Sequence, residues 1–417
     1  MQTKLTAEFS GTRDGREAEA VLRKCVHCGF CTATCPTYQL LGDELDGPRG
    51  RIYLIKQVLE GAAPTRKTQQ HLDRCLTCRN CETTCPSGVQ YGNLVEIGRR
   101  IVDARVERPA AEQALRGALK AGLTSPLFGP ALKLGQLARP FLPAALKAKV
   151  PPRAAGAAQA RRWPTRTHKR KVLLLLGCVQ PALLPGINPA TARVLDAAGI
   201  QTLVADGAGC CGAVRTHLDD QAGGLADMRR NIDAWWPLVD GLTSEGKVEA
   251  IVSNASACGL QVKDYAHALA HDADYADKAR RVSALARDLS ELLPDIVAAL
   301  KGRLRPPRQR KLAFHPPCTL QHGQQLRGGV EQQLTALGFE VQLAAGESHL
   351  CCGSAGTYSV LQPQLSMQLR DRKLAHLAPL QAQAIVSANV GCIQHLQSGT
   401  ATPVRHWVQV LDEALPL

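Results

Sequence analysis

The sequence has little that would place it in a membrane or outside the cell. No apolar run among its 417 residues reaches the roughly 20 needed to cross a bilayer, and the longest, Val172–Gly186, is interrupted by glycine, glutamine and proline. The first ten residues lack the basic and then apolar pattern of a signal peptide. We therefore expect neither an integral membrane protein nor a secreted disulfide scaffold. The 45% hydrophobic content excludes a disordered chain.

Nucleotide-binding signatures and aromatic side chains are also scarce. Neither the Gly-x-Gly-x-x-Gly fingerprint of dinucleotide-binding folds nor the P-loop signature occurs. This predicts that the chain holds no NAD or FAD, so it cannot carry out two-electron substrate chemistry alone. Aromatic residues make up only 4%, which leaves few stacking platforms for a nucleic acid despite the net charge of +14. We expect no nucleic-acid partner.

The positive charge lies in one segment. Between Arg99 and Lys171 there are 17 Lys and Arg against three acidic residues, a net charge of +14 that equals the charge of the whole chain. Within it, Pro126–Leu146 mixes leucine and phenylalanine with a few basic residues, a pattern typical of interfacial or partner-facing helices. A solvated linker is the alternative. We expect the segment to bind an anionic membrane surface or a partner subunit. The basic side chains proposed for this contact are Arg161, Arg162, Lys169, Arg170 and Lys171.

Cysteine, in contrast, is abundant. The chain has 16 cysteines: eight within residues 1–98, none within 99–170 and eight within 171–417. In an intracellular protein such clusters indicate metal or redox chemistry rather than disulfides.

The first eight cysteines form two copies of the spacing C-x2-C-x2-C-x3-C-P, and each cysteine of the first copy recurs 50 residues later. This is the spacing of bacterial ferredoxins, in which three thiolates hold one [4Fe–4S] cluster and the fourth ligates the other cluster. Two zinc sites are the alternative, but they would leave the twofold pattern of eight cysteines and two prolines unexplained. The predicted ligands are Cys25, Cys28, Cys31 and Cys85 for cluster 1, and Cys75, Cys78, Cys81 and Cys35 for cluster 2. Good helix formers at 50–59 and 68–73 indicate an α-helical ferredoxin domain.

The other eight cysteines form a longer repeat. Each copy has a single cysteine, a Cys-Cys-Gly pair and a second single cysteine, and the copies are offset by 134 to 141 residues. Apolar runs precede the single cysteines and helical segments lie between, which is the strand–helix–strand order of a parallel α/β unit. The cysteines would then follow the carboxyl ends of strands, where α/β sheets bind ligands. The candidate metal ligands are Cys178, Cys210, Cys211 and Cys258 in the first copy, and Cys318, Cys351, Cys352 and Cys392 in the second.

Each Cys-Cys-Gly pair is expected to offer two thiolates from one tight turn, with Gly212 and Gly353 in an unusual backbone conformation. This resembles the CCG domain of the heterodisulfide reductase family, whose motif ends in C-x-x-C. Here the last position is Gln261 or His395, so each copy offers four cysteines. Three interpretations stay open: an iron–sulfur cluster in one or both copies, a zinc ion, or buried thiols without metal. Because four buried thiolates without metal are costly, we predict a third cluster in at least one copy. His315 and His395 are further candidate ligands or neighbours.

The whole arrangement resembles the family of glycolate oxidase iron–sulfur subunits. The resemblance is carried by the cysteine motifs and by local phrases such as Gly47-Pro-Arg-Gly-Arg-Ile52, Pro86-Ser-Gly-Val-Gln-Tyr91 and the segment His315–His322. It implies a membrane-associated complex in which a flavin subunit oxidises glycolate to glyoxylate and this chain passes electrons toward a quinone. It also implies a cytoplasmic protein, peripheral on the inner face of the cell membrane, with no catalytic residue of its own. Electron transfer in a related lactate or glycerol-3-phosphate dehydrogenase, or catalysis like that of heterodisulfide reductase, is the alternative.

The expected fold class is therefore α + α/β. We predict an α-helical ferredoxin-like domain with two [4Fe–4S] clusters over residues 1–98 and a basic helical connector over 99–170. Two pseudo-symmetric α/β CCG units follow, over 171–300 and 301–417.

Overall fold

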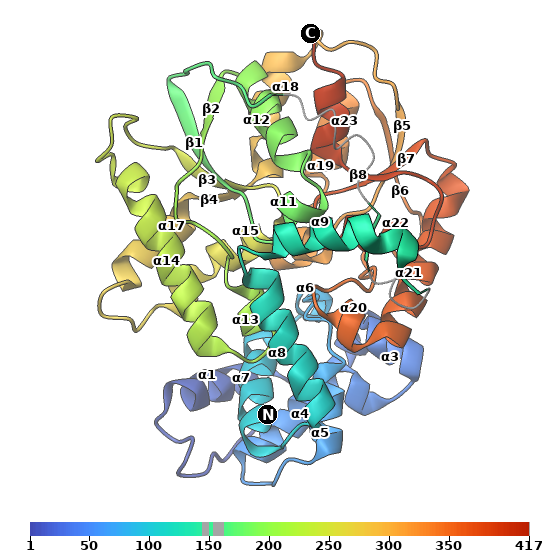
Figure 1. The fold of residues 1–417 in the computed structure, drawn as a ribbon. Helices are drawn as coiled ribbons and strands as arrows, with labels where there is room; N and C mark the ends of the chain where they lie inside the picture. The colour runs from blue at the N-terminus through green and yellow to red at the C-terminus, as the bar shows by residue number, and fades with distance from the viewer. Residues whose placement is uncertain (144–149, 153–161, 417) are drawn as a thin grey trace. The chain divides into compact units, whose positions relative to one another are not determined.

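The computed structural model of the chain describes residues 1–143, 150–152 and 162–416. It divides into two compact units (Figure 1). Unit 1 comprises Met1–Gly117, Cys318–Gln325 and Gly346–His376, and unit 2 comprises Ala118–Pro317, Leu326–Ala345 and Leu377–Leu417. Of the segment 99–171 that is expected to dock, residues 144–149 and 153–161, including Arg161, lie outside the described residues.

The first hundred residues of unit 1 are helical, and the described residues of this unit include no strand. Thr12 caps the first helix by accepting a hydrogen bond from the backbone N–H of Gly15, at 3.0 Å. The helices pack around a core that includes Leu22, Ile55, Leu72 and Leu94. They are α1 (Arg13–Lys24), α2 (Phe30–Ala33), α3 (Pro36–Leu41), η1 (Glu44–Asp46), α4 (Pro48–Leu59), α5 (Arg66–Asp73), α6 (Asn80–Thr84) and α7 (Tyr91–Arg105). Both helices expected between the cysteine motifs are therefore present, as α4 and α5.

The expected boundary at residue 98 falls inside α7. Arg99 on this helix is buried, and its Nη2 donates to the carbonyl oxygens of Leu72 (2.7 Å) and Cys75 (2.6 Å). Arg99 was counted above with the basic segment, but it belongs to the interior of unit 1 and is not part of a docking surface.

Unit 2 contains two four-stranded parallel sheets with the same topology. Their strand orders are β2-β1-β3-β4 and β6-β5-β7-β8. The strands are β1 (Arg170–Leu175), β2 (Ile200–Leu203), β3 (Ala250–Ser253), β4 (Ala286–Asp288), β5 (Lys311–Phe314), β6 (Glu340–Leu343), β7 (Ala384–Ser387) and β8 (Val404–His406). The central strands β1, β3, β5 and β7 are apolar runs, as expected for parallel strands covered on both faces. The four apolar runs expected before the single cysteines are the central strands β1, β3, β5 and β7, whereas the three-residue β4 and β8 are too short to show a pattern.

The two α/β copies are related by a pseudo-twofold arrangement. Helix α12 (Ile187–Ala197) of the first copy packs against α23 (Trp407–Glu413) of the second, and α18 (Leu293–Leu300) of the first packs against α19 (Gly329–Ala336) of the second (Figure 1). His406 Nε2 donates to the carbonyl oxygen of Asn254 at 2.8 Å, because its Nδ1 accepts from the Val408 N–H. The predicted fold class, with two pseudo-symmetric α/β units, is confirmed.

The other helices that the structure describes complete the two units. They are α8 (Ala110–Thr124), α9 (Phe128–Ala138), η2 (Arg139–Phe141), α11 (Gln180–Leu183), α13 (Ala213–Thr216), α14 (Gln221–Asp240), α15 (Ser256–Lys263), α16 (Tyr265–Ala268), α17 (Ala276–Leu285), η4 (Leu289–Leu292), η5 (Thr319–Gly323), α20 (Tyr358–Leu361), α21 (Pro363–Leu377), η6 (Ala378–Leu380) and α22 (Val390–Gln397).

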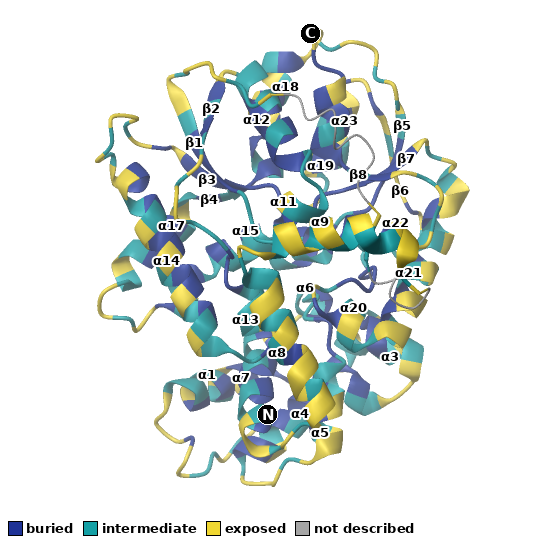
Figure 2. Cartoon of the chain, viewed as in Figure 1, coloured by how far each residue is buried: buried dark blue, intermediate teal, exposed yellow. Residues whose placement is uncertain are grey.

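The connector contains the helices α8, α9 and η2, whereas its described residues 150–152 and 162–169 form neither helix nor strand. Leu134 and Leu137 on α9 are 69% and 70% exposed, and Phe141 in η2 is 87% exposed. Figure 2 shows exposed residues along α9. Arg170 and Lys171 were expected to dock, but they open β1 and are already paired. Arg170 contacts Glu249 and Asp295, and Lys171 contacts Glu245. Among the described helices, none combines the length and the apolar character that a bilayer-crossing segment requires.

Candidate metal centres

Five cysteines of unit 1 line one surface pocket: Cys25, Cys28, Cys31, Cys85 and Cys81. We call the first four of these site 1. Cys25 ends α1, Cys31 lies on α2 and Cys85 ends α6, so the fourth cysteine of the second motif joins three from the first. Burial raises the pKa of the Cys31 thiol to about 11, and the neighbouring thiols of Cys25 and Cys85 contribute. Cys28 is exposed, so site 1 opens to the surface of unit 1.

A second set, which we call site 2, consists of Cys75, Cys78, Cys81 and Cys35. Cys75, Cys81 and Cys35 are buried. Burial raises the pKa of the Cys81 thiol well above its usual value, and Cys78, Cys75 and Cys35 add to the rise as close neighbours. The structure therefore brings together the two crossed sets that the spacing predicts, each with three thiols from one motif and one from the other.

The two cysteine loops share a backbone conformation. His27 and Thr77 occupy equivalent positions and have φ of 57° and 51°. Gly29 and Arg79, two residues further on, have φ of 83° and 56°. Left-handed backbone at non-glycine residues is strained and concentrates at functional sites. The sequence repeat is therefore matched by a repeat in backbone conformation. In each motif the left-handed residues bend the loop around the first three cysteines.

Two buried arginines distinguish site 2 from site 1. Arg51 is 1% exposed, and its Nε donates to the carbonyl oxygen of His71 at 2.7 Å. Arg99 binds the carbonyl oxygen of Cys75 itself, and the Tyr91 hydroxyl donates to Cys75 Sγ at 3.6 Å. Burial alone would raise the pKa of Cys75, but the charges of Arg51 and Arg99 outweigh it and the pKa is lowered. Site 2 is therefore the more buried of the two, and two buried arginines lie beside it, of which Arg51 also pairs with Asp46 at 3.5 Å.

The second CCG pair lies directly against site 2. Cys318 and Cys351 are within 3.7 Å of each other, sulfur to sulfur, and they pack with Cys78 and Leu76 in one apolar cluster of unit 1. Burial raises the pKa of Cys78, and the Cys318 thiol is the next cause. Cys318 and Cys351 of the second copy thus adjoin Cys78 of site 2 within unit 1.

Hydrogen bonds of His322 connect the loop before Cys351 with helix α6 of the second cysteine motif. Its Nε2 donates to the carbonyl oxygen of His349 at 2.8 Å, two residues before Cys351. Its Nδ1 accepts from the Thr83 hydroxyl at 3.1 Å, on α6. His322 closes the segment His315–His322 that carries the family resemblance, and this contact gives that motif a structural role.

The first CCG copy lies in unit 2, with its thiols beyond the carboxyl ends of β1, β2 and β3. Hydrogen bonds from the thiols of Cys178 and Cys211 lower the pKa of Cys210. Cys211 in turn hydrogen-bonds with Cys258, and these sulfur neighbours raise its own pKa. The sulfur atoms of all four predicted cysteines of this copy are therefore connected by a chain of neighbouring thiol contacts.

The Cys-Cys-Gly turns have the geometry expected of them. Gly212 and Gly353 have φ of 95° and 89°. A Cβ at Gly212 would lie 2.9 Å from the carbonyl oxygen of Gly224, so both conformation and space require glycine. The Asn231 amide donates to the Cys210 carbonyl oxygen at 2.7 Å, and the Tyr265 hydroxyl donates to that of Cys211 at 2.9 Å.

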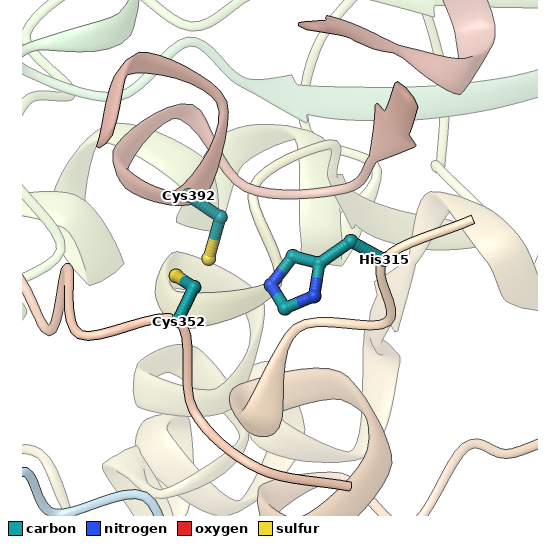
Figure 3. A group of neighbouring side chains, drawn as sticks. All are labelled: His315, Cys352 and Cys392. Atoms are coloured by element: carbon teal, nitrogen blue, oxygen red, sulfur yellow. The ribbon is translucent and has the colours of Figure 1, made fainter. Parts of the chain in front are cut away.

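A histidine joins the remaining cysteines of the second copy. One ligand atom each of His315, Cys352 and Cys392 lies within 4.8 Å of the others, and all three residues are buried. Figure 3 shows the imidazole and the two thiols directed toward one another. Zinc accepts this ligand type as well as iron does, so the open interpretations of the second copy stay open. Among the described residues, His395 is not part of such a group.

The donor sets fit iron–sulfur clusters. Site 1, site 2 and the first CCG copy each offer four cysteine sulfurs, the ligand chemistry that soft iron–sulfur centres take. Thiols crowded in buried positions have raised pKa values, and a bound cluster compensates the charge of their thiolates. Sequence analysis missed Arg51 and Arg99, because a charge count does not separate a buried arginine from a surface one. The one available signal was the position of Arg51 within the phrase Gly47–Ile52.

A ferredoxin-type helical domain with two cysteine sets and two cysteine-rich α/β copies defines an electron-transfer iron–sulfur protein. A family model of a 4Fe-4S dicluster domain matches residues 21–89, and a cysteine-rich domain model matches residues 172–263 and 312–397. The chain is 55% identical to the glycolate oxidase iron-sulfur subunit of Escherichia coli (strain K12), over 100% of this chain and 99% of the relative. It therefore belongs to the family of glycolate oxidase iron–sulfur subunits, and it is an electron-transfer subunit of an oxidoreductase.

More distant relatives fall within the same group of proteins. A probable glycolate oxidase iron-sulfur subunit of Bacillus subtilis (strain 168) is 29% identical over 92% of this chain and 90% of the relative. Lactate utilization protein A of Bacillus velezensis is 25% identical over 54% of this chain and 90% of the relative.

Proposed function

We propose that this chain carries electrons from the flavin subunit of a glycolate oxidase, which converts glycolate to glyoxylate, toward a membrane quinone. Identity of 55% along the full length to a glycolate oxidase iron–sulfur subunit supports the substrate. The observation that carries the electron-transfer path is the packing of Cys78 of site 2 with Cys318 and Cys351 of the second CCG copy. A path made of adjoining cysteine sets needs no substrate pocket on this chain.

The cysteines would bind the clusters, and two buried arginines would affect their reduction potential. When bound, a [4Fe–4S] cluster at each ferredoxin site takes up and releases one electron. Cys25, Cys28, Cys31 and Cys85 would hold one, and Cys75, Cys78, Cys81 and Cys35 the other. Site 1, exposed through Cys28, is the point where an electron enters or leaves unit 1. Arg51 and Arg99 place positive charge beside site 2 and so favour the extra electron there.

We further propose that at least one CCG copy holds a third cluster, through Cys178, Cys210, Cys211 and Cys258 or through Cys318, Cys351, Cys352 and Cys392. Mutual contact of the four thiols in the first copy supports this, and so does the packing of Cys318 and Cys351 with Cys78 of site 2. Iron analysis of the anaerobically purified chain tests it. About eight irons per chain would leave both copies empty of iron, about twelve would support one cluster, and about sixteen two.

The proposal includes a peripheral site on the inner face of the cell membrane. Residues 113–195 contain no acidic side chain. Within this range, α9 and η2 expose the apolar side chains of Leu134, Leu137 and Phe141. Basic charge with exposed leucine and phenylalanine is the pattern of a helix that lies in a membrane interface. Changing these three residues to serine should abolish sedimentation with anionic vesicles at low salt, whereas serine at Leu242, which is 72% exposed in unit 2, is the matched control. Unchanged binding of the triple variant would remove this part of the proposal.

A reduction assay tests the substrate. The chain is purified anaerobically with its flavin subunits, and glycolate or lactate is added while electron paramagnetic resonance follows its iron–sulfur centres. We expect glycolate to reduce the centres faster than lactate does. Faster reduction by lactate would favour the second candidate, a related lactate dehydrogenase, which the similarity to lactate utilization protein A supports.

A further inference from the structure

We propose that Lys373 is the buried cation that sets the reduction potential of the group held by Cys318, Cys351 and Cys352 in the second CCG copy. The inference rests on the electron-transfer function proposed above and names a residue that tunes it. Lys373 lies on α21, and sequence analysis did not single it out.

Lys373 is held against the loop that leads to the cysteine pair. It is only 2% exposed, and its Nζ donates to the carbonyl oxygen of Glu347. The same oxygen accepts the backbone N–H of Leu350 at 3.0 Å, immediately before Cys351. The ammonium is thereby fixed at the base of the turn that presents both thiols.

The charge of Lys373 has no carboxylate partner. Among the residues that the structure describes, no ion pair involves its ammonium, and the Glu347 carboxylate binds Arg372 and His376 instead. The groups whose negative charge acts on Lys373 are the thiols of Cys352 and Cys351, the Glu347 carboxylate and the Cys318 thiol. Burial lowers the pKa of Lys373 and these groups act in the opposite direction. A buried ammonium is stable only beside negative charge, and the three sulfurs are where that charge can lie.

The first copy has no equivalent cation at this position. Lys373 comes 20 residues after Gly353, and the residue 20 after Gly212 is Ile232. Ile232 is fully buried in the apolar core of the first copy. On the same helix, Arg229 and Arg230 pair with Asp272 and Asp227. At this position the second copy has a buried cation and the first copy has an apolar side chain, so the redox groups of the two copies have different electrostatic surroundings.

The direction of the effect follows from charge. A group bound by these sulfurs gains one negative charge when it accepts an electron, from a reduced centre at site 2 or from dithionite in an assay. A fixed positive charge close by favours the reduced form, so Lys373 raises the reduction potential. Removing the charge should make this group harder to reduce.

The test is an anaerobic potentiometric titration of the full chain, read by electron paramagnetic resonance. Lys373→Met removes the charge and keeps the length of the side chain. At the wild-type midpoint potential, we expect its ratio of reduced to oxidised third centre to fall about tenfold or more. Lys373→Arg should restore the ratio, and Ile232→Met in the first copy should leave it unchanged. The signals of sites 1 and 2 should move less than that of the third centre.

Each outcome decides. An unchanged potential in Lys373→Met, with wild-type iron content, overturns the inference. If Lys373→Met loses the signals of sites 1 and 2, Lys373→Gln is titrated under the same criterion. A wild-type chain whose CCG copies contain no redox group also overturns the inference. The proposed function fails separately, when glycolate does not reduce sites 1 and 2.

Discussion

Arg99 is predicted to stabilise site 2 both as a hydrogen-bond donor and as a charge. Its guanidinium makes four hydrogen bonds: two to the carbonyl oxygen of Leu72 (2.7 and 3.1 Å), one to that of Cys75 (2.6 Å) and a longer one to that of Asp73 (3.5 Å). Arg99→Met keeps most of the apolar packing but leaves these carbonyl oxygens without this donor. Hydrogen bonds to charged groups contribute about 1.5–3 kcal/mol each and are not additive, so we expect the free energy of unfolding to fall by about 3–5 kcal/mol.

The same substitution should lower the reduction potential of site 2. Arg99 touches the backbone of the site 2 ligand Cys75, and a unit charge within about 8 Å at an effective dielectric of about 20 is worth about 2 kcal/mol. That energy corresponds to a roughly thirtyfold change in the ratio of reduced to oxidised centre.

Two measurements separate these effects. Chemical unfolding of the anaerobic chain gives stability, and a redox titration gives the potential of each ferredoxin site. Arg99→Lys, which keeps the charge but has fewer donors, should recover more of the potential than of the stability. Equal potentials in Arg99→Met and wild type would refute the assignment of Arg99 as the charge beside site 2.

Three further predictions follow from the same structure. Cys35→Ser should damage the centre of site 2 and Cys85→Ser that of site 1, because each cysteine belongs to the other motif's set; spectra of the single variants decide, and the reverse pattern would show that ligation is not crossed. His406 is fully buried, and burial lowers its pKa from 6.5 to about 4. Above about pH 6.5 the imidazole is neutral in both the folded and the unfolded chain, so its burial there costs no free energy of unfolding through protonation. As the pH falls toward 4 the unfolded chain binds the proton first, and up to about 3 kcal/mol is lost; thermal unfolding of wild type and His406→Asn between pH 5 and 7.5 should show a smaller slope in the variant, and parallel curves would contradict this. Gly212→Ala should reduce the iron content of the first CCG copy, because alanine fits neither the φ of 95° nor the space beside Gly224, whereas Gly199→Ala, with φ of 77° and open space, is a control for backbone strain alone.

Local sequence predicted much of this molecule, because ligand spacing and apolar runs are local properties. The C-x2-C-x2-C-x3-C-P motifs gave the two cysteine sets that the structure brings together. The runs around Leu174, Val252 and Val386 gave central strands of both sheets. The family resemblance was confirmed by identity along the whole chain.

What the sequence could not show is which residues meet across the fold. Nothing in the motifs indicates that Cys318 and Cys351 pack with Cys78 rather than standing apart as a separate site. A count of charges assigned Arg99 and Lys171 to one basic surface, although the first is buried at site 2 and the second pairs with Glu245. Lys373 resembles any other helical lysine until burial is known.

The central claim is that sites 1 and 2 lie on the path of electrons from flavin to quinone. The most direct measurement compares the wild-type complex with one carrying Cys81→Ser, which removes a ligand from site 2. Glycolate is added without oxygen, and flavin bleaching and the reduction of a soluble quinone are followed together. We predict that the variant bleaches its flavin at the wild-type rate but reduces the quinone at least about tenfold more slowly. Quinone reduction at the wild-type rate in the variant would contradict the account.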